Sequence, residues 1–163
     1  MNDDPSHSPE PLLPEVVIAR ENAVFWMDGQ GRWHNRHGRF EHKRIIDYFN
    51  RSIRRDRDGY YLTQVRGDIR EKVYFPFEDT PLFVVDVIPT DPMRLALNTA
   101  ETIPLDPRNL FTQADRLYQQ RGDDRIKFSD RALMAMAPHL EESAAGLAVR
   151  VGCRTYPIPE HPL

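Results

Sequence analysis

The stretch IREKVYFPFEDTPLFVVDVIPTDPMRLALNT, residues 69–99, decides the fold class. It contains three apolar segments rich in β-branched and aromatic residues, as strands are. The segments alternate with the proline-containing turns Glu78-Asp79-Thr80-Pro81 and Pro89-Thr90-Asp91-Pro92. Such connections are too short for helical crossovers, so the strands that they join should pair antiparallel. The stretch therefore predicts an antiparallel β-meander.

A hairpin and a helix are expected before this stretch. Residues Val24–Asn35 are apolar and aromatic around two glycines, which can adopt the positive φ angles of a hairpin turn. The helix is expected over Glu41–Arg55. Its buried face should contain Ile45, Phe49 and Ile53, because they recur at four-residue spacing.

The Asp58-Gly59 pair should end this helix in a turn. Gly59 is expected to need φ > 0, a conformation that residues with a Cβ rarely adopt. The aromatic and β-branched residues Tyr60–Thr63 then favour a strand.

A second helix is expected late in the chain. It should begin after Ser129, a good N-cap residue, and extend to about Glu142 unless Pro138 kinks it or ends it early. Further strands are expected around it, over Glu101–Leu105, Leu117–Gln120, Arg125–Phe128 and Leu147–Tyr156.

This order of elements predicts an α+β fold, in which an N-terminal hairpin-helix-strand unit is followed by an antiparallel sheet closed by the late helix. Four regions are expected along the chain. They are a disordered Pro-rich tail (1–15), an N-terminal α+β unit (16–68), an antiparallel β domain with one helix (69–157) and a second tail (158–163).

Composition limits where the protein works and what it binds. No stretch approaches the roughly 18 apolar residues of a membrane span, and the first residues lack the basic and apolar regions of a signal peptide. A cytoplasmic protein is therefore expected. The single cysteine, Cys153, lies in an apolar alternation and is expected to be a buried, inert thiol.

Positive charge is concentrated in one segment although the net charge is −3. From Arg32 to Arg57 there are nine basic residues and three acidic ones. This segment could attract an acidic protein, a lipid headgroup or nucleic acid, while a salt-bridged solvated surface is the simpler interpretation. The candidate binding residues are Arg36, Arg39, Lys43, Arg51 and Arg54.

Four motifs in series resemble the bacterial domain of unknown function 1285 (DUF1285) family, over roughly residues 24–156. The motifs are Gly31-Arg32-Trp33, Asp58-Gly59-Tyr60-Tyr61-Leu62, Glu78-Asp79-Thr80-Pro81-Leu82, and Leu97-Asn98-Thr99 followed by Ile103-Pro104-Leu105-Asp106. The resemblance implies no assigned activity. It implies a second half similar to pleckstrin-homology domains, and with it a role in binding peptides, lipids or proteins in signal transduction.

Signals for catalysis or metal binding are weak. His34, His37 and His42 lie within nine residues, but their spacing matches no standard zinc site and no cysteine is near. Glu78 and Asp79 precede Thr-Pro and favour a turn over acid–base chemistry. No nucleotide-binding, hydrolase or metalloprotease motif occurs, so no metal, cofactor or catalytic residue is assigned.

The sequence therefore favours a non-enzymatic binding or regulatory module that recognises a protein, peptide or small ligand through a groove or sheet edge of its second half. One alternative is a hydrolase or transferase without a sequence signature, using His34, His37 or Glu78. The other is nucleic-acid binding through the basic segment 32–57. Oligomeric state is left open.

Overall fold

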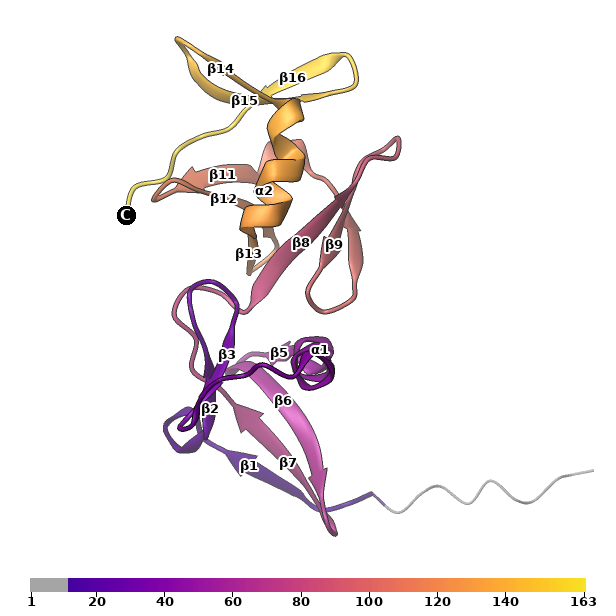
Figure 1. The fold of residues 1–163 in the computed structure, drawn as a ribbon, viewed down its shortest axis with the longest axis vertical. Helices are drawn as coiled ribbons and strands as arrows, with labels where there is room; N and C mark the ends of the chain where they lie inside the picture. Colours follow the sequence, from indigo (N-terminus) through magenta and orange to yellow (C-terminus); the bar gives the residue numbers. More distant parts are fainter. Residues whose placement is uncertain (1–11) are drawn as a thin grey trace, which may run out of the picture.

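The computed structural model describes residues 12–163, in which two sheet-containing halves lie one above the other (Figure 1). Residues 1–11 of the predicted tail lie outside the described residues. Residues 12–14 have no regular structure, and the first strand begins at Glu15. None of the helices in the described part of the chain is long and apolar enough to cross a membrane.

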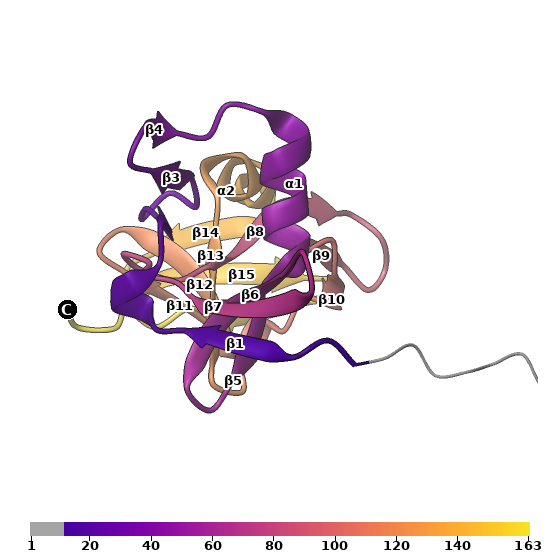
Figure 2. The same cartoon turned by 90° about the horizontal axis from the view of Figure 1, so that it is seen from below.

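The N-terminal half contains two small sheets and the longer helix. One sheet has the strand order β1-β7-β6-β5, with β1 parallel to β7, and the other has the order β2-β3-β4. Figure 2 shows the short hairpin that ends in β4 near the start of α1. The elements are β1 (Glu15–Ile18), η1 (Arg20–Asn22), β2 (Phe25–Met27), β3 (Trp33–Asn35), β4 (Gly38–Arg39), α1 (Lys43–Ser52), β5 (Arg54–Asp56), β6 (Gly59–Arg66) and β7 (Ile69–Tyr74).

The second half contains a six-stranded sheet of order β10-β9-β8-β13-β12-β11, the helix α2, and a three-stranded sheet of order β14-β15-β16. In sequence, helix α2 follows the strands of the first sheet and precedes those of the second. In space, it packs on β8 and β13 (Figure 1). The elements are β8 (Leu82–Ile88), β9 (Arg94–Leu97), β10 (Thr102–Pro104), η2 (Pro107–Asn109), β11 (Leu110–Gln113), β12 (Arg116–Arg121), β13 (Asp124–Phe128), α2 (Asp130–Met136), η3 (Ala137–His139), β14 (Leu140–Ser143), β15 (Gly146–Val151) and β16 (Arg154–Pro157).

The α+β class is confirmed, and so is the antiparallel pairing of β8 with β9 across the turn at residues 89–92. The expected antiparallel sheet formed from β7 onward is wrong in two respects. First, β7 belongs to the four-stranded sheet of the N-terminal (lower) half and β8 to the six-stranded sheet of the second (upper) half. These consecutive strands therefore do not pair. The link between them pairs with β2 instead, because Met27 N donates to Pro76 O at 3.0 Å and Glu78 N donates to Met27 O at 3.0 Å. Second, β8 pairs parallel with β13, so the six-stranded sheet is mixed and not purely antiparallel.

The first helix is shorter than predicted. It ends at Ser52, and Arg54–Asp56 forms a hairpin with β6 across the Asp58-Gly59 turn. Gly59 has φ = +131°, which confirms the expected positive angle. Ile53 is buried, but Ile45 is 46% exposed, so the apolar face does not extend to the first turn.

The late helix and the last strand also differ from expectation. Ser129 Oγ accepts a hydrogen bond from Ala132 N at 3.2 Å, as predicted for an N-cap. The helix ends at Met136, because Pro138 lies in the 3-10 turn that follows, and β14 occupies the remainder of the predicted helix. The predicted strand Leu147–Tyr156 is a hairpin with Gly152 and Cys153 in its turn, so the expectation of a buried thiol is wrong: Cys153 is exposed.

One hydrophobic core runs through both halves. Trp33 lies in its lower part, 1% exposed, where its indole Nε1 donates to Asn50 Oδ1 at 2.7 Å. Its ring packs edge-on or tilted against Phe25, Phe49 and Phe75, with centroid distances of 5.9, 5.3 and 4.9 Å. The hairpin of β2 and β3 is thereby fixed to both α1 and β7.

Gly31 at the tip of this hairpin touches the upper half. It has φ = +80°, and a Cβ at this position would lie 2.9 Å from the ring of Phe83 in β8. We expect Gly31→Ala to destabilise the protein by about 1–3 kcal/mol more than Gly67→Ala, as measured by urea unfolding. Gly67 is a matched control, because it has φ = +60° but, apart from its chain neighbours, no described residue lies within 4 Å of the added Cβ. Equal losses of unfolding free energy in the two variants would show that Phe83 moves away from the added Cβ without cost.

Candidate functional site

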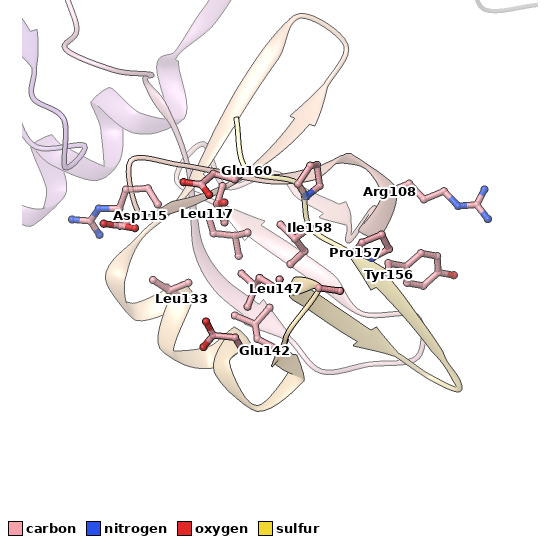
Figure 3. Close-up of a pocket in the computed structure, with 16 residues that line it drawn as sticks. Arg108, Asp115, Leu117, Leu133, Glu142, Leu147, Tyr156, Pro157, Ile158 and Glu160 are labelled. Carbon is pink, nitrogen blue, oxygen red and sulfur yellow. The ribbon is translucent and has the colours of Figure 1, made fainter. Parts of the chain in front are cut away.

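A cavity of about 900 Å³ lies between the β11–β12 hairpin, α2 and the C-terminal strands. Figure 3 shows the side chains of Leu117, Leu133, Leu147 and Ile158 gathered around the same space. Together with Leu140 these side chains form the apolar floor of the cavity. Leu117 and Ile158 are buried, and the other three are partly buried, so the floor combines packed core with accessible apolar surface.

Local structure explains how these distant residues meet. The Ser129 cap begins α2 one turn before Leu133, and Leu133 lines the cavity together with Leu117 of β12. Ile158 follows β16, and its N–H donates to Leu147 O at 2.8 Å, which brings both side chains to the floor. The cavity is therefore built from secondary structure and not from a loop alone.

The C-terminal segment forms one wall of the cavity. Thr112 N donates to Pro159 O at 2.9 Å, and His161 N donates to Thr112 O at 2.7 Å, so the segment lies parallel to the edge of β11. The imidazole of His161 stacks on the ring of Phe111 with a centroid distance of 4.2 Å. These contacts hold Ile158 and Glu160 in place.

The mouth of the cavity carries both signs of charge, and most of its basic and acidic groups form no ion pair with another described residue. Asp115, Glu142 and Glu160 make no ion pair within residues 12–163. Arg116, in contrast, pairs with Asp130 outside the cavity lining. Figure 3 shows the three carboxylates toward one side, with Arg108 and Tyr156 toward the opposite side. The unpaired charge near the apolar floor is therefore mainly negative.

The five predicted binding residues are divided between the two ends of α1. Arg36 and Arg39 belong to the β3–β4 hairpin and Lys43 to the first turn of the helix, whereas Arg51 lies in its last turn and Arg54 begins β5. Positions 43 and 51 are about 12 Å apart along the helix axis. Lys43 Nζ is already 2.6 Å from Asp47 Oδ2. A single basic surface formed by all five residues stays a prediction.

The three histidines do not converge. His34 Nε2 lies 2.7 Å from Asp28 Oδ2 and its ring stacks on Trp26, while His37 accepts a hydrogen bond from Arg36 and His42 precedes α1. Within the described range no group of three or more His, Cys, Asp or Glu side chains could hold a metal ion.

Asp28 has a structural role in the hairpin turn. Burial by itself would raise the pKa of Asp28, but hydrogen bonds from His34 and from the backbone N–H groups of Arg32 and Gln30 hold that pKa below its ordinary value. The carboxylate thus stays ionised and closes the turn.

Glu78 and Asp79 point to different partners. Glu78 Oε2 accepts from Gly29 N at 2.8 Å, whereas Asp79 Oδ2 accepts from Lys127 Nζ at 2.9 Å and from Tyr118 Oη at 2.7 Å. Burial would raise the pKa of Asp79, but these hydrogen bonds lower it below the usual value. The pair joins the two halves and does not present two carboxylates to one substrate.

Sequence reasoning missed part of the cavity. The prolines at 157, 159 and 162 favour irregular structure, so the sequence predicts only a tail over residues 158–163, which includes Ile158 and Glu160. The signal that could have indicated a buried position is Ile158 itself, a large apolar residue among those prolines. In the structure Ile158 is 6% exposed. Leu117, Leu133 and Leu147 were assigned to elements, but nothing in their local pattern reveals a shared cavity.

No family model and no curated protein matches this sequence. A solved structure of a DUF1285 family protein from Silicibacter pomeroyi DSS-3 is similar, with a TM-score of 0.60 and 13% identity, over 93% of this chain and 86% of that chain. A DUF1285 family protein from Shewanella baltica OS155 matches with a TM-score of 0.47 and 16% identity, over 66% of this chain and 84% of that chain. The first likeness shows that this chain has the fold of a DUF1285 family protein, as its sequence motifs indicated.

Proposed function

We propose that this chain, a protein with the DUF1285 fold, is a non-enzymatic binding module whose ligand site is the cavity between α2 and the C-terminal strands. The observation that carries the proposal is an apolar floor next to three carboxylates that form no ion pair within residues 12–163. Its volume of about 900 Å³ lies within the roughly 300–1,000 Å³ of ordinary ligand pockets. The cavity can therefore accept a ligand the size of a few side chains.

The chemistry of the lining favours an apolar ligand with a positive charge. Leu133, Leu140 and Leu147 are partly exposed, and covering them removes apolar surface from water, which contributes about 25 cal/mol per Å². Asp115, Glu142 and Glu160 would attract a cation held above the floor. A short peptide segment with an apolar and a basic residue, or an apolar amine, combines both features.

A regulatory role in signalling is part of this proposal and rests on analogy. In the second half of this chain, α2 covers one face of the six-stranded sheet. This arrangement agrees with a domain similar to pleckstrin-homology domains. The parallel pair of β8 and β13 departs from the antiparallel sheet that we expected for such a domain. Fold alone does not assign function, so the cavity carries the argument.

The enzyme and nucleic-acid alternatives have less support. His34 and Glu78 are hydrogen-bonded to groups of the β2–β3 turn, and His37 lies at the next hairpin, so these candidates do not surround one substrate position. For nucleic acid, the basic residues of segment 32–57 are spread over both ends of α1.

Matched fragments of opposite charge test the proposed ligand class. We expect 4-phenylbutylamine to shift the amide resonances of Leu117, Leu133 and Leu147 in an NMR titration, and 4-phenylbutyrate to shift them much less. The reason is that both carry the same apolar group but only the amine is attracted by the carboxylates. Equal shifts from both fragments, or shifts confined to other residues, would contradict the proposal.

A cavity-filling variant provides the matched control. Ala145 is exposed and lines the cavity, so Ala145→Trp should block it and abolish the shifts. Met134 is 77% exposed on α2 and does not line the cavity, so Met134→Trp should leave the titration unchanged. Amine binding that survives Ala145→Trp would place the fragment elsewhere.

A further inference from the structure

A second cleft, of about 580 Å³, lies between the two halves of the molecule. From the lower half it is lined by the end of α1, by β5 and by Tyr60. From the upper half it is lined by the loop between β9 and β10 and by the facing ends of β12 and β13. It shares no lining residue with the cavity next to α2. Any ligand of this cleft is thus independent of the proposed function.

The cleft has an excess of positive charge. Four guanidinium groups and two carboxylates line it, which leaves an excess of two positive charges. These groups belong to Arg51, Arg54, Arg55, Arg121, Glu101 and Asp124. The cleft also contains apolar surface from Ile53, Leu82 and Ala100.

Only two of the four arginines are neutralised by the cleft's own acids. Arg55 Nε lies 2.9 Å from Asp124 Oδ1, and Arg121 Nη1 donates to Glu101 Oε1 at 2.9 Å. Arg51 and Arg54 make no ion pair within residues 12–163. The excess charge therefore belongs to these two neighbouring side chains.

Arg54 is held in place without being neutralised. Its Nη1 donates to the carbonyl oxygens of Arg51 and Ile53, at 2.9 Å in each case. A guanidinium group has five N–H donors in a fixed plane, so Nε and Nη2 are left for a ligand. An arginine fixed in this way loses less side-chain entropy on binding.

The loop that forms the opposite wall of the cleft is held by hydrogen bonds and contains a polar group without a partner among the described residues. Asn98 holds the loop, because its Oδ1 accepts from Phe83 N at 3.0 Å and its Nδ2 donates to Pro81 O at 2.9 Å. The next residue, Thr99, lines the cleft, and its buried hydroxyl has no hydrogen-bond partner among the described residues.

We propose that this cleft binds the phosphate group of a phosphorylated small molecule, with Arg51 and Arg54 as its principal ligands. A phosphate monoester carries nearly two negative charges at neutral pH, which matches the excess of two positive charges. The planar guanidinium group suits its oxygens geometrically. The cleft is larger than a phosphate ion, and Ile53 and Leu82 offer apolar surface to the group that carries the phosphate.

Calorimetric titration at fixed ionic strength tests this proposal with two probes that share a ring. Phenyl phosphate should bind more tightly than benzenesulfonate, because the sulfonate has a single charge. Arg51→Gln should weaken phenyl phosphate binding roughly tenfold, since it removes one charge-assisted contact. Arg51 is exposed and its side chain forms no hydrogen bond in the described structure, so this variant should fold normally.

The control is Arg36→Gln/Arg39→Gln, which removes two positive charges at the other end of α1. It should leave the affinity for phenyl phosphate within about twofold, because exposed charges separated by more than about 10 Å are largely screened. Three results would overturn the proposal: no binding by the wild-type protein at millimolar phenyl phosphate, equal affinity for both probes, or equal weakening in the control and in Arg51→Gln.

Discussion

Replacing Trp33 by alanine should lower the free energy of unfolding by about 3–5 kcal/mol, the usual cost of removing a large buried aromatic side chain. Trp33 is 1% exposed and packs against three phenylalanine rings from β2, from α1 and from the residue that follows β7. The cavity left behind cannot be filled by one neighbour alone, because these rings belong to different elements. Urea unfolding followed by circular dichroism measures the loss.

Two further variants separate packing from hydrogen bonding at this position. Trp33→Phe keeps an aromatic ring but removes the donor to Asn50 Oδ1, and we expect a loss of about 1–2 kcal/mol. Trp26, on the neighbouring strand, is 38% exposed, so Trp26→Ala should cost less than half as much as Trp33→Ala. A similar loss for both tryptophan-to-alanine variants would mean that the hairpin is not fixed through Trp33.

Replacing Lys127 by methionine should destabilise the protein by about 2–3 kcal/mol, because it breaks a partly buried ion pair and leaves Asp79 with fewer partners. Lys127 Nζ also donates to Gly29 O at 2.7 Å, so one ammonium group connects β13 to the hairpin of the lower half. Lys43→Met is the matched control. Lys43 pairs with Asp47 at the surface, and its loss should cost less than about 1 kcal/mol.

Acid titration checks the electrostatic origin of this loss. Because the pKa of Asp79 is lowered in the folded state, its ionised form stabilises the protein above the ordinary aspartate value of about 4, and this stabilisation is lost as the pH falls further. The difference between wild type and Lys127→Met should therefore shrink in acid. A constant difference down to the acid transition would assign the loss to packing of the lysine stem instead.

A double-mutant cycle with Asp79→Asn isolates the pair itself. We expect the two substitutions to be non-additive by about 1–3 kcal/mol, since the side chains are in direct contact. Additive losses would show that Lys127 acts mainly through Gly29 O.

The sequence predicted those parts of the fold that depend on local signals. The Asp58-Gly59 turn and the Ser129 cap are fixed by residues within four positions of one another, and both were predicted. The parallel pair of β8 and β13 was not, because Leu82 meets Ile126 across more than forty intervening residues. The early end of α1 was missed because the spacing of Phe49 and Ile53 fits a helix as well as a helix followed by a strand.

The candidate site was less predictable for the same reason. Composition identified the basic segment, but only the fold shows that Arg51 and Arg54 face the upper half while Arg36 and Arg39 lie at the other end of the helix. The cavity near α2 combines residues from position 108 to position 160, and each residue has an ordinary local role. Long-range packing, which no local pattern records, creates both sites.

The place of β7 affects how this chain can be shortened. The predicted boundary between residues 68 and 69 falls in the turn between β6 and β7, and β7 lies between β6 and the parallel strand β1. A fragment ending at that turn would leave β1 without its partner and one side of β6 without a neighbour. Unpaired strand edges are templates for association with other chains. Fragments cut there would therefore tend to aggregate, and expression of either half alone would report on edge-to-edge association more than on the properties of the native halves.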